Sequence, residues 1–227
     1  HQKRNQPKRS LLKRNNKSLS CKKIYIQMNT DFLTPIHTVL EASLDVLLSG
    51  SIGSSIQIYT QKNGFPDLNN IEIAILGVDE DRNTDDNFGS GKDLHHIRSH
   101  FYKLFPGNWN VPIADLGNIK KGETTSDTHF AITEVIKSLL KMNIIPIIIG
   151  GGQDITFSNY KAYDQLEQTV NLVVVDSKFD LGNLEDNLSS KSYLSKIIME
   201  VPTNLFNFSN IGYQTYLNPQ EEIKLIQ

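Results

Sequence analysis

Two short polar stretches, each directly after an apolar run, carry the residues best suited to chemistry. Residues 150–154 read GGGQD and residues 176–180 read DSKFD. Hard divalent cations prefer carboxylate and imidazole ligands, and Asp176, Lys178 and Asp180 stand at alternate positions. If the chain stays extended through Asp180, these three side chains project on one face, as a shared metal site requires. Asp176 and Asp180 are therefore the candidate ligands if any metal binds.

Lys178 changes what this site can do. Its ammonium has no lone pair to offer a cation and would repel a dication, while it could pair with the two flanking carboxylates. We hypothesise that this ammonium replaces a metal charge and that an internal salt bridge organises the site. Gln153 offers a carbonyl oxygen, which is a poorer transition-metal ligand than imidazole, and Asp154 is predicted to cap the following helix.

Other chemistries are less well supported by the sequence. The glycine turn at 150–152 could hold a phosphate at a helix N-terminus, but it lacks the dinucleotide and P-loop patterns, and Asp154 would repel an anion. His96 and His100 are four residues apart and could bind zinc, but no third ligand is evident and a solvated helix face is the favoured interpretation. Cys21 has no evident histidine partner.

Alternating strand and helix patterns must position these stretches. An early helix is expected over 31–48, with Asp31 or Thr34 as its cap, and a short alternating segment follows at 56–58. Strands are predicted at 71–78, 111–116, 144–149, 170–175 and 206–212. Helices are predicted at 93–105, 126–142, 154–166, 191–199 and from 219 onward.

Strands this apolar predict burial on both faces and therefore a parallel sheet. Right-handed crossovers then place helices on both sides, which gives an α/β fold, a three-layer α/β/α sandwich with a mostly parallel sheet. Sites in such sheets form at the carboxyl ends of the strands, where both polar stretches lie. The final segment begins a helix after a strand, and we expect the sheet to lack its last strands, so that the fold is C-terminally incomplete.

Composition bounds the remaining possibilities. The chain has 227 residues, 38% of them hydrophobic, which suits one domain, expected over 28–227. The apolar run at 144–149 is far shorter than the roughly 20 residues of a membrane span, so no membrane is expected as a partner. A single cysteine excludes an internal disulfide, and with no signal sequence evident a cytoplasmic location is expected.

Charge separates the first residues from the rest. Residues 1–23 hold nine Lys or Arg and no acid, whereas residues 24–227 hold 14 basic and 25 acidic groups, a formal charge of −11. Such a basic arm could bind nucleic acid or an acidic membrane surface. We favour a solvated, disordered tail or upstream extension over 1–27, because it lacks periodicity and aromatic residues interleaved with the charges; nucleic acid is not the expected partner.

The two polar stretches together resemble the ureohydrolase family of arginase, agmatinase and formimidoylglutamase. In that family an apolar strand ends in Gly-Gly-Asp-His-Ser, and a later strand ends in Asp-Ala-His-x-Asp. Gln153 then stands at the position of one metal-binding histidine and Lys178 at that of the other, while Asp176 and Asp180 match the aspartates. Weaker matches are the strand at 71–77, Arg98, the Asp-Leu-Gly at 115–117 and the strand at 210–212.

The resemblance implies an arginase-like fold and, in active members, two manganese ions that activate a bridging water against a guanidinium or amidine carbon. With both histidines replaced, we expect an inactive or altered protein that binds a small molecule or a protein partner, with a vestigial site at Gln153, Asp154, Asp176, Lys178 and Asp180. No cofactor is expected in that case. The alternative is an active formimidoylglutamase or arginase-type hydrolase that uses manganese. The family's habit of forming oligomers suggests self-association.

Overall fold

The computed structural model describes residues 28–84, 86–183 and 185–226, so the basic arm and Cys21 lie outside the described residues. A first sheet has the order β1-β4-β3-β5, with β2 beside β4. Its strands are β1 (Leu33–Thr34), β2 (Gln57–Ile58), β3 (Ile73–Val78), β4 (Ile113–Ile119) and β5 (Ile145–Ile149). All of its pairings are parallel except β1 with β4.

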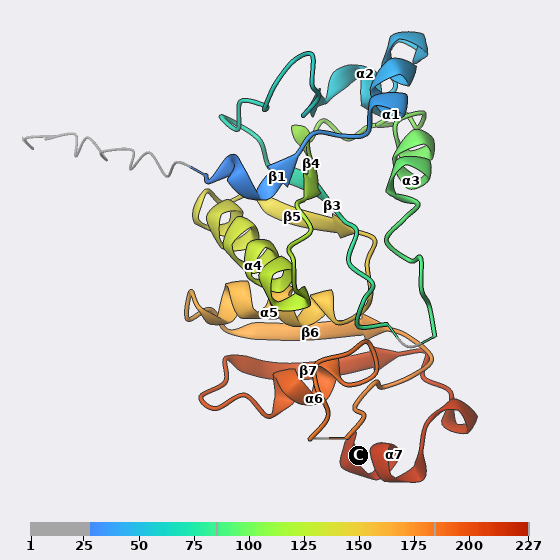
Figure 1. Cartoon of the computed structure of the whole chain (residues 1–227), viewed down its shortest axis with the longest axis vertical. Coiled ribbons are helices and arrows are strands. Elements are labelled where there is room, and N and C mark those ends of the chain that lie inside the picture. Colours follow the sequence, from blue (N-terminus) through green and yellow to red (C-terminus); the bar gives the residue numbers. More distant parts are fainter. Residues whose placement is uncertain (1–27, 85, 184, 227) are drawn as a thin grey trace, which may run out of the picture.

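Helices cover both faces of the β3–β4 part of this sheet (Figure 1). Helix α4 (Thr125–Lys141) packs its apolar stripe on one face, where Ala74 and Leu76 of β3 join Ile132 and Ile136 in the main core. Helix α3 (Leu94–Phe101) lies on the other face. Its residue Arg98 and its C-cap residue Tyr102 both contact Asp115 of β4. This region has the three layers that the sequence predicts.

A second, two-stranded sheet pairs β6 (Val170–Val175) with β7 (Leu205–Ile211) in parallel. Helices α5 (Ile155–Asp164), α6 (Tyr193–Ile198) and α7 (Gln220–Ile226) pack around it, and α5 also lies against α4 (Figure 1). A separate core holds them together, formed by Tyr160, Phe179, Leu181, Tyr193, Leu194, Ile197 and Ile223. The α5 contacts therefore connect the two sheets.

The burial predicted for β5 and β6 on both faces is wrong. Within the described ranges β5 pairs only with β3 and β6 only with β7, so each keeps one open edge. Alternate side chains reach solvent: Ile145 of β5 is 61% exposed and Val175 of β6 is 79% exposed. Each of the two strands therefore buries its apolar side chains on one face only. This is consistent with the expected incompleteness of the sheet.

The helix predicted over 31–48 is also wrong. A 3-10 turn, η1 (Thr30–Phe32), leads into β1, and helix begins only with α1 (Thr38–Ser43), followed by η2 (Leu44–Val46) and α2 (Ile52–Ser55). Pro35 explains the change, because the residue before a proline is driven out of helical geometry. The cap of α1 is His37, whose Nδ1 accepts a hydrogen bond from Val39 N (3.2 Å), in place of Asp31 or Thr34.

The remaining elements agree with the sequence to within a few residues, and the α/β, arginase-like fold class is confirmed. A last 3-10 turn, η3 (Thr215–Leu217), joins β7 to α7. Within the described ranges, no helix combines the length and apolar character needed to span a bilayer.

Candidate functional site

The loops that follow β3, β4 and β5 meet at the carboxyl ends of these strands, at one end of the first sheet (Figure 1). Gly150 and Gly151 turn the chain out of β5 with φ of 85° and 81°, a backbone region that glycine occupies without strain. Gly152 N then donates to Glu80 O in the loop after β3 (2.8 Å). The glycine stretch therefore presses Gln153 and Asp154 against the neighbouring loop.

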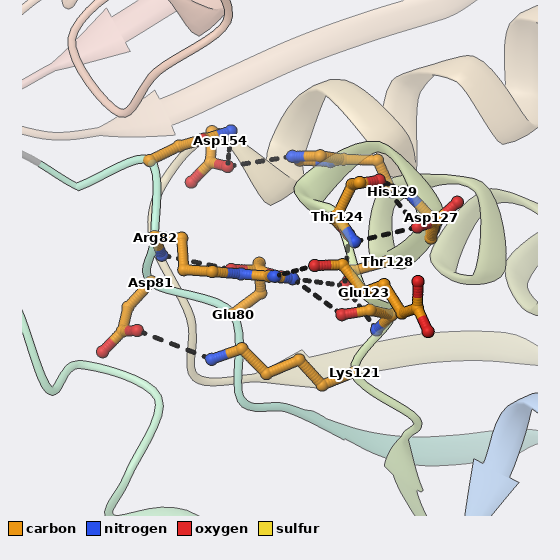
Figure 2. Close-up of polar contacts among 12 residues, drawn as sticks. Glu80, Asp81, Arg82, Lys121, Glu123, Thr124, Asp127, Thr128, His129 and Asp154 are labelled. Atoms are coloured by element: carbon orange, nitrogen blue, oxygen red, sulfur yellow. Dashed lines mark hydrogen bonds and ion pairs between the residues drawn. The ribbon is translucent and has the colours of Figure 1, made fainter.

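A network of paired charges supports this edge (Figure 2). The Arg82 guanidinium donates to the buried Glu80 carboxylate (Nε to Oε1, 2.9 Å) and to the carbonyl oxygens of Glu123 (2.7 Å) and Gly122 (3.1 Å) before α4. Burial disfavours the ionised Glu80, but the hydrogen bonds from Arg82 and Thr128 outweigh it and lower the pKa of Glu80 to about 2. This network fixes the loop after β3 onto the start of α4.

Asp154 does not cap α5 with its side chain, contrary to the sequence prediction. It occupies the N-cap position with helical backbone angles, and its side chain makes no capping hydrogen bond. The fully buried carboxylate instead accepts from His129 Nε2 (3.0 Å), Asn83 Nδ2 (3.3 Å) and Ser190 Oγ (3.4 Å). Asp154 thereby joins α4, the loop after β3 and the loop after β6; Figure 2 shows its contact with His129.

His129 is a member of this site that sequence reasoning missed. Because a carboxylate only accepts, Nε2 carries the proton shared with Asp154, and Nδ1 faces the Ser158 hydroxyl at 2.5 Å. The order Ser158, His129, Asp154 has the composition of a nucleophilic triad, but Ser158 is buried and no substrate can reach it. His129 is a residue of α4, and no pattern in the sequence links it to Asp154, 25 positions later.

Gln153 and Asp176, predicted to share a site, are brought together across the two sheets. The Gln153 side-chain amide donates from Nε2 to Asp176 Oδ2. Asp176 Oδ1 also accepts from the backbone N–H of Lys178 (3.0 Å) and from Ser177 Oγ (3.4 Å). Burial opposes ionisation of Asp176, but these hydrogen bonds outweigh it and hold its pKa below the ordinary value. Both carboxylate oxygens are therefore occupied by N–H and O–H donors.

The salt bridge predicted for Lys178 is not formed. β6 ends at Val175, and the chain turns through a left-handed Asp180 (φ 55°), so the alternate positions do not stay on one extended face. Lys178 is exposed, and across the described ranges its ammonium makes no ion pair within 4.0 Å with Asp176 or Asp180. Its charge acts on Asp180 only from a distance.

Asp180 is buried without a partner. Its residue is 9% exposed, and its carboxylate has no hydrogen bond or ion pair anywhere in the described part of the chain. Burial, followed by the nearby charge of Asp176, raises the pKa of Asp180 to about 6, although the Lys178 ammonium opposes the shift. Asp180 therefore differs from every other carboxylate described above.

Arg98, a weaker match to the family, plays a structural part. Arg98 binds the fully buried Asp115 through Nε (2.7 Å) and Nη2 (2.9 Å), which fixes α3 on β4. His96 and His100 contact one another with ring centroids 4.7 Å apart. Over residues 28–84, 86–183 and 185–226, no three His, Cys, Asp or Glu side chains form a group that could hold a metal.

Comparison with known proteins decides the family. The arginase family model matches residues 71–227, more than half of the chain. The chain belongs to the arginase family. It is 30% identical over 130 residues to the formimidoylglutamase of Macrococcus caseolyticus, covering 54% of this chain and 41% of that protein. It is 27% identical to the Streptococcus gordonii formimidoylglutamase, over 49% of this chain and 36% of that protein. The chain thus spans about two-fifths of the curated relatives it matches.

Solved structures show the arginase fold in the same region. The formiminoglutamase of Trypanosoma cruzi, determined with Mn²⁺, superimposes with a TM-score of 0.64 at 18% identity, over 70% of this chain and 58% of that one. The arginase of Medicago truncatula gives a TM-score of 0.59 at 16% identity, over 83% and 62%. At this level of identity the likeness concerns the fold alone.

The residues at this arginase-family site do not fit a pair of manganese ions. Gln153 directs an amide N–H, which is a donor, at Asp176, where a metal would need a lone pair. Lys178 supplies a cation in place of a ligand, and both oxygens of Asp176 already accept hydrogen bonds. Among the residues considered, Asp180 alone offers an unused carboxylate.

Proposed function

We propose that this arginase-family chain works without a two-manganese centre, by binding a small molecule or a protein partner, and that it does not hydrolyse amidines or guanidines. The observation that carries the proposal is the Gln153–Asp176 hydrogen bond, which joins across the site two positions that the family's active members use for metal. The donors around Asp176 stabilise its charge as a metal would, so the loops can stay in place without one.

The competing function is metal-dependent hydrolysis of a linear amidine or guanidine. It is favoured by the formimidoylglutamase relatives and by the free carboxylate of Asp180. In that case Asp176 and Asp180 would act as manganese ligands with other groups of the full-length protein.

An activity assay on the full-length protein separates the two functions. Formimidoylglutamate, agmatine and arginine would be incubated with the protein and excess Mn²⁺, and product release followed. We expect no turnover above the protein-free control. Turnover that disappears in Asp176→Asn would establish the hydrolase and contradict the proposal.

A restored-ligand variant tests whether the two positions derive from a metal site. The double substitution Gln153→His and Lys178→His replaces the amide donor and the ammonium with imidazoles, which bind manganese through a lone pair. We expect its Mn²⁺ affinity to rise at least tenfold over the wild type in a calorimetric titration. A matched control, Gln165→His with Lys196→His, adds two imidazoles elsewhere. Equal gains in both variants would remove the support for the motif alignment.

Self-association stays a prediction. Exposed apolar side chains on β5 and on β6, such as Ile145 and Val175, are the kind of surface that such a contact would cover. Light scattering of the full-length protein measures its oligomeric state directly.

A further inference from the structure

A pocket of about 400 Å³ lies between the segment from η2 to α2 and the end of α3. This volume is within the roughly 300–1,000 Å³ of small-molecule sites. Figure 1 shows α1, α2 and α3 grouped at the end of the molecule opposite α7. None of the lining residues belongs to the candidate site, and the wall from η2 to α2 precedes the residues 71–227 that the arginase family model matches. The main lining residues are Val46, Leu47, Leu48, Ser51, Tyr102 and Lys103.

The two walls of the pocket are held together by direct contacts. Ile52 N donates to Leu104 O (2.7 Å) and Gly53 N donates to Tyr102 O (3.0 Å), so the start of α2 is bound to the end of α3. A Cβ atom on Gly53 would lie 2.5 Å from Tyr102 Cβ, and glycine is therefore required for this close approach. Leu47 packs on the same apolar cluster as Tyr102. The shape of the pocket is thus set without a ligand.

Ser51 brings a buried hydroxyl without a partner to this pocket. Its residue is 0% exposed, and its Oγ has no hydrogen bond in the described part of the chain. A serine at a helix N-cap normally accepts from the second or third N–H of the helix. In α2 these donors are already used, because Gly53 N donates to Tyr102 O and Ser54 N donates to Ser51 O (3.1 Å). Buried polar groups seldom lack a partner, and a ligand in the pocket would supply one.

The free side-chain donors of the pocket point to an acceptor as the ligand's polar group. The hydroxyls of three other lining residues, Ser43, Ser99 and Tyr102, donate to groups within the protein at 2.6, 2.7 and 2.9 Å. The exposed Lys103 ammonium has no ion pair or hydrogen bond with another described residue. Among the described lining side chains, the Ser51 hydroxyl and the Lys103 ammonium are therefore the donors that remain.

Charge and apolar surface define the class of ligand. Lys103 is the charged residue among those lining the pocket, whereas the acids of the neighbouring segment, Glu41 and Asp45, line a separate hollow. A carboxylate only accepts hydrogen bonds and carries the charge opposite to that of Lys103. Val46 and Leu48 are 81% and 70% exposed and offer apolar surface to a hydrocarbon group. An ammonium compound would be repelled, and a neutral alcohol would leave Lys103 unpaired.

We propose that this pocket binds a small monocarboxylate with a hydrocarbon chain. The carboxylate accepts from the Ser51 hydroxyl and the Lys103 ammonium, and the chain covers Val46, Leu47 and Leu48. The inference goes beyond the proposed function and does not depend on it, because the pocket shares no residue with the candidate site.

Octanoate is the probe, used with the full-length protein at pH 7, where its carboxylate is ionised. Three control compounds change one property each: 1-octanol lacks the charge, octylammonium reverses it, and acetate lacks the chain. Binding would be followed through the amide NMR shifts of residues 46–52 and 99–104. We expect saturable shifts for octanoate, weaker binding of 1-octanol, and none for octylammonium or acetate. Octylammonium affinity equal to that of octanoate, or no octanoate binding, would overturn the proposal.

A lysine variant tests the contact with the charge. Lys103→Met keeps an unbranched side chain without the ammonium, and octanoate affinity should fall about threefold to fivefold, as for an exposed ion pair. The affinity for 1-octanol should not change. Lys224→Met removes the same charge from an exposed position on α7 and should leave both affinities unchanged. Equal octanoate affinity in the wild type and Lys103→Met would overturn the proposal.

A serine variant separates binding from a structural role. Replacing an N-cap serine by alanine ordinarily lowers stability. Because the Ser51 hydroxyl has no partner in the free protein, Ser51→Ala should keep a urea unfolding midpoint equal to or above that of the wild type. Its octanoate affinity should fall roughly tenfold through the lost hydrogen bond to a charged group. A lower midpoint with unchanged octanoate affinity would assign the hydroxyl to the fold and overturn the proposal.

Discussion

Two buried aspartates, Asp115 within β4 of the first sheet and Asp180 in the loop after β6 of the second, differ in how their carboxylates are satisfied. Asp115 accepts from Arg98 Nε (2.7 Å), Arg98 Nη2 (2.9 Å) and the Tyr102 hydroxyl (2.9 Å). Asp180 has no such partner among the described residues. The satisfied carboxylate fixes a helix to the sheet, whereas Asp180 accepts no hydrogen bond from another described residue. The two acids should therefore contribute to stability with opposite signs.

The largest effect should come from breaking the satisfied pair. Arg98→Met keeps most of the side-chain volume but leaves Asp115 buried without its counter-charge. Removing one partner of a buried ion pair typically costs about 3–5 kcal/mol, and we expect a loss of that size in the free energy of unfolding. Urea denaturation followed by circular dichroism measures it.

The double variant Arg98→Met with Asp115→Leu supplies the control for this pair. If the cost comes from the stranded charge, removing both groups should restore most of the lost free energy. A double variant that is as unstable as the single one would show that the guanidinium matters through packing, and the contrast with Asp180 would lose its basis.

The substitution Asp180→Asn should increase the free energy of unfolding, whereas Arg98→Met should decrease it. The pKa of the Asp180 carboxyl is raised by burial from its ordinary value of 3.8 to about 6, so folding disfavours its ionised form. Its contribution to stability is therefore greatest below about pH 4, falls as the pH rises from 4 to 6, and is constant above that. Asn removes the buried charge and should stabilise the protein by about 1–3 kcal/mol at pH 7.

The difference between the two proteins should shrink as the pH falls and vanish at about pH 2.5, where Asp180 is protonated in both folded and unfolded chains. Paired urea titrations at about pH 2.5 and pH 7 measure this, since other titrating groups affect both proteins alike. A variant less stable than wild type at pH 7 would mean that Asp180 has a favourable partner and that the comparison with Asp115 is wrong.

The smallest effect is expected for Lys178→Ala. The ammonium is exposed and has no ion pair with Asp176 or Asp180 in the described structure, so its loss should change the free energy of unfolding by less than about 0.5 kcal/mol. Thermal unfolding at low and high salt gives the measurement. A salt-sensitive loss above about 1 kcal/mol would restore the salt-bridge hypothesis drawn from the sequence.

Sequence patterns were sufficient where local periodicity decides the structure. The apolar stripe of α4 and the apolar run of β3 predicted both elements to within a few residues. The resemblance to the ureohydrolase motifs, which lie at strand ends, implied that Gln153 and Asp176 share a site, and a hydrogen bond joins their side chains. The prediction of a helix from residue 31 was wrong because Pro35 drives the residue before it out of helical geometry, and helix begins only at Thr38. The spacing of apolar residues does not reveal this effect of proline.

Tertiary contacts account for the other differences. Asp154 has the residue type of a cap, but His129 and Asn83 reach it from elements distant in sequence and take its carboxylate. The salt bridge of Lys178 assumed an extended strand through Asp180, whereas the left-handed backbone there separates the side chains. Neither the turn at Asp180 nor the partners of Asp154 can be predicted from the spacing of residues in the sequence.

Metal stoichiometry tests most directly whether direct side-chain contacts have replaced the metal centre. The full-length protein would be purified in excess Mn²⁺, desalted, and its manganese content determined by mass spectrometry beside Gln153→His with Lys178→His. The Gln153–Asp176 hydrogen bond predicts well under one ion per wild-type chain and a higher content in the variant. Two ions per wild-type chain would contradict the account.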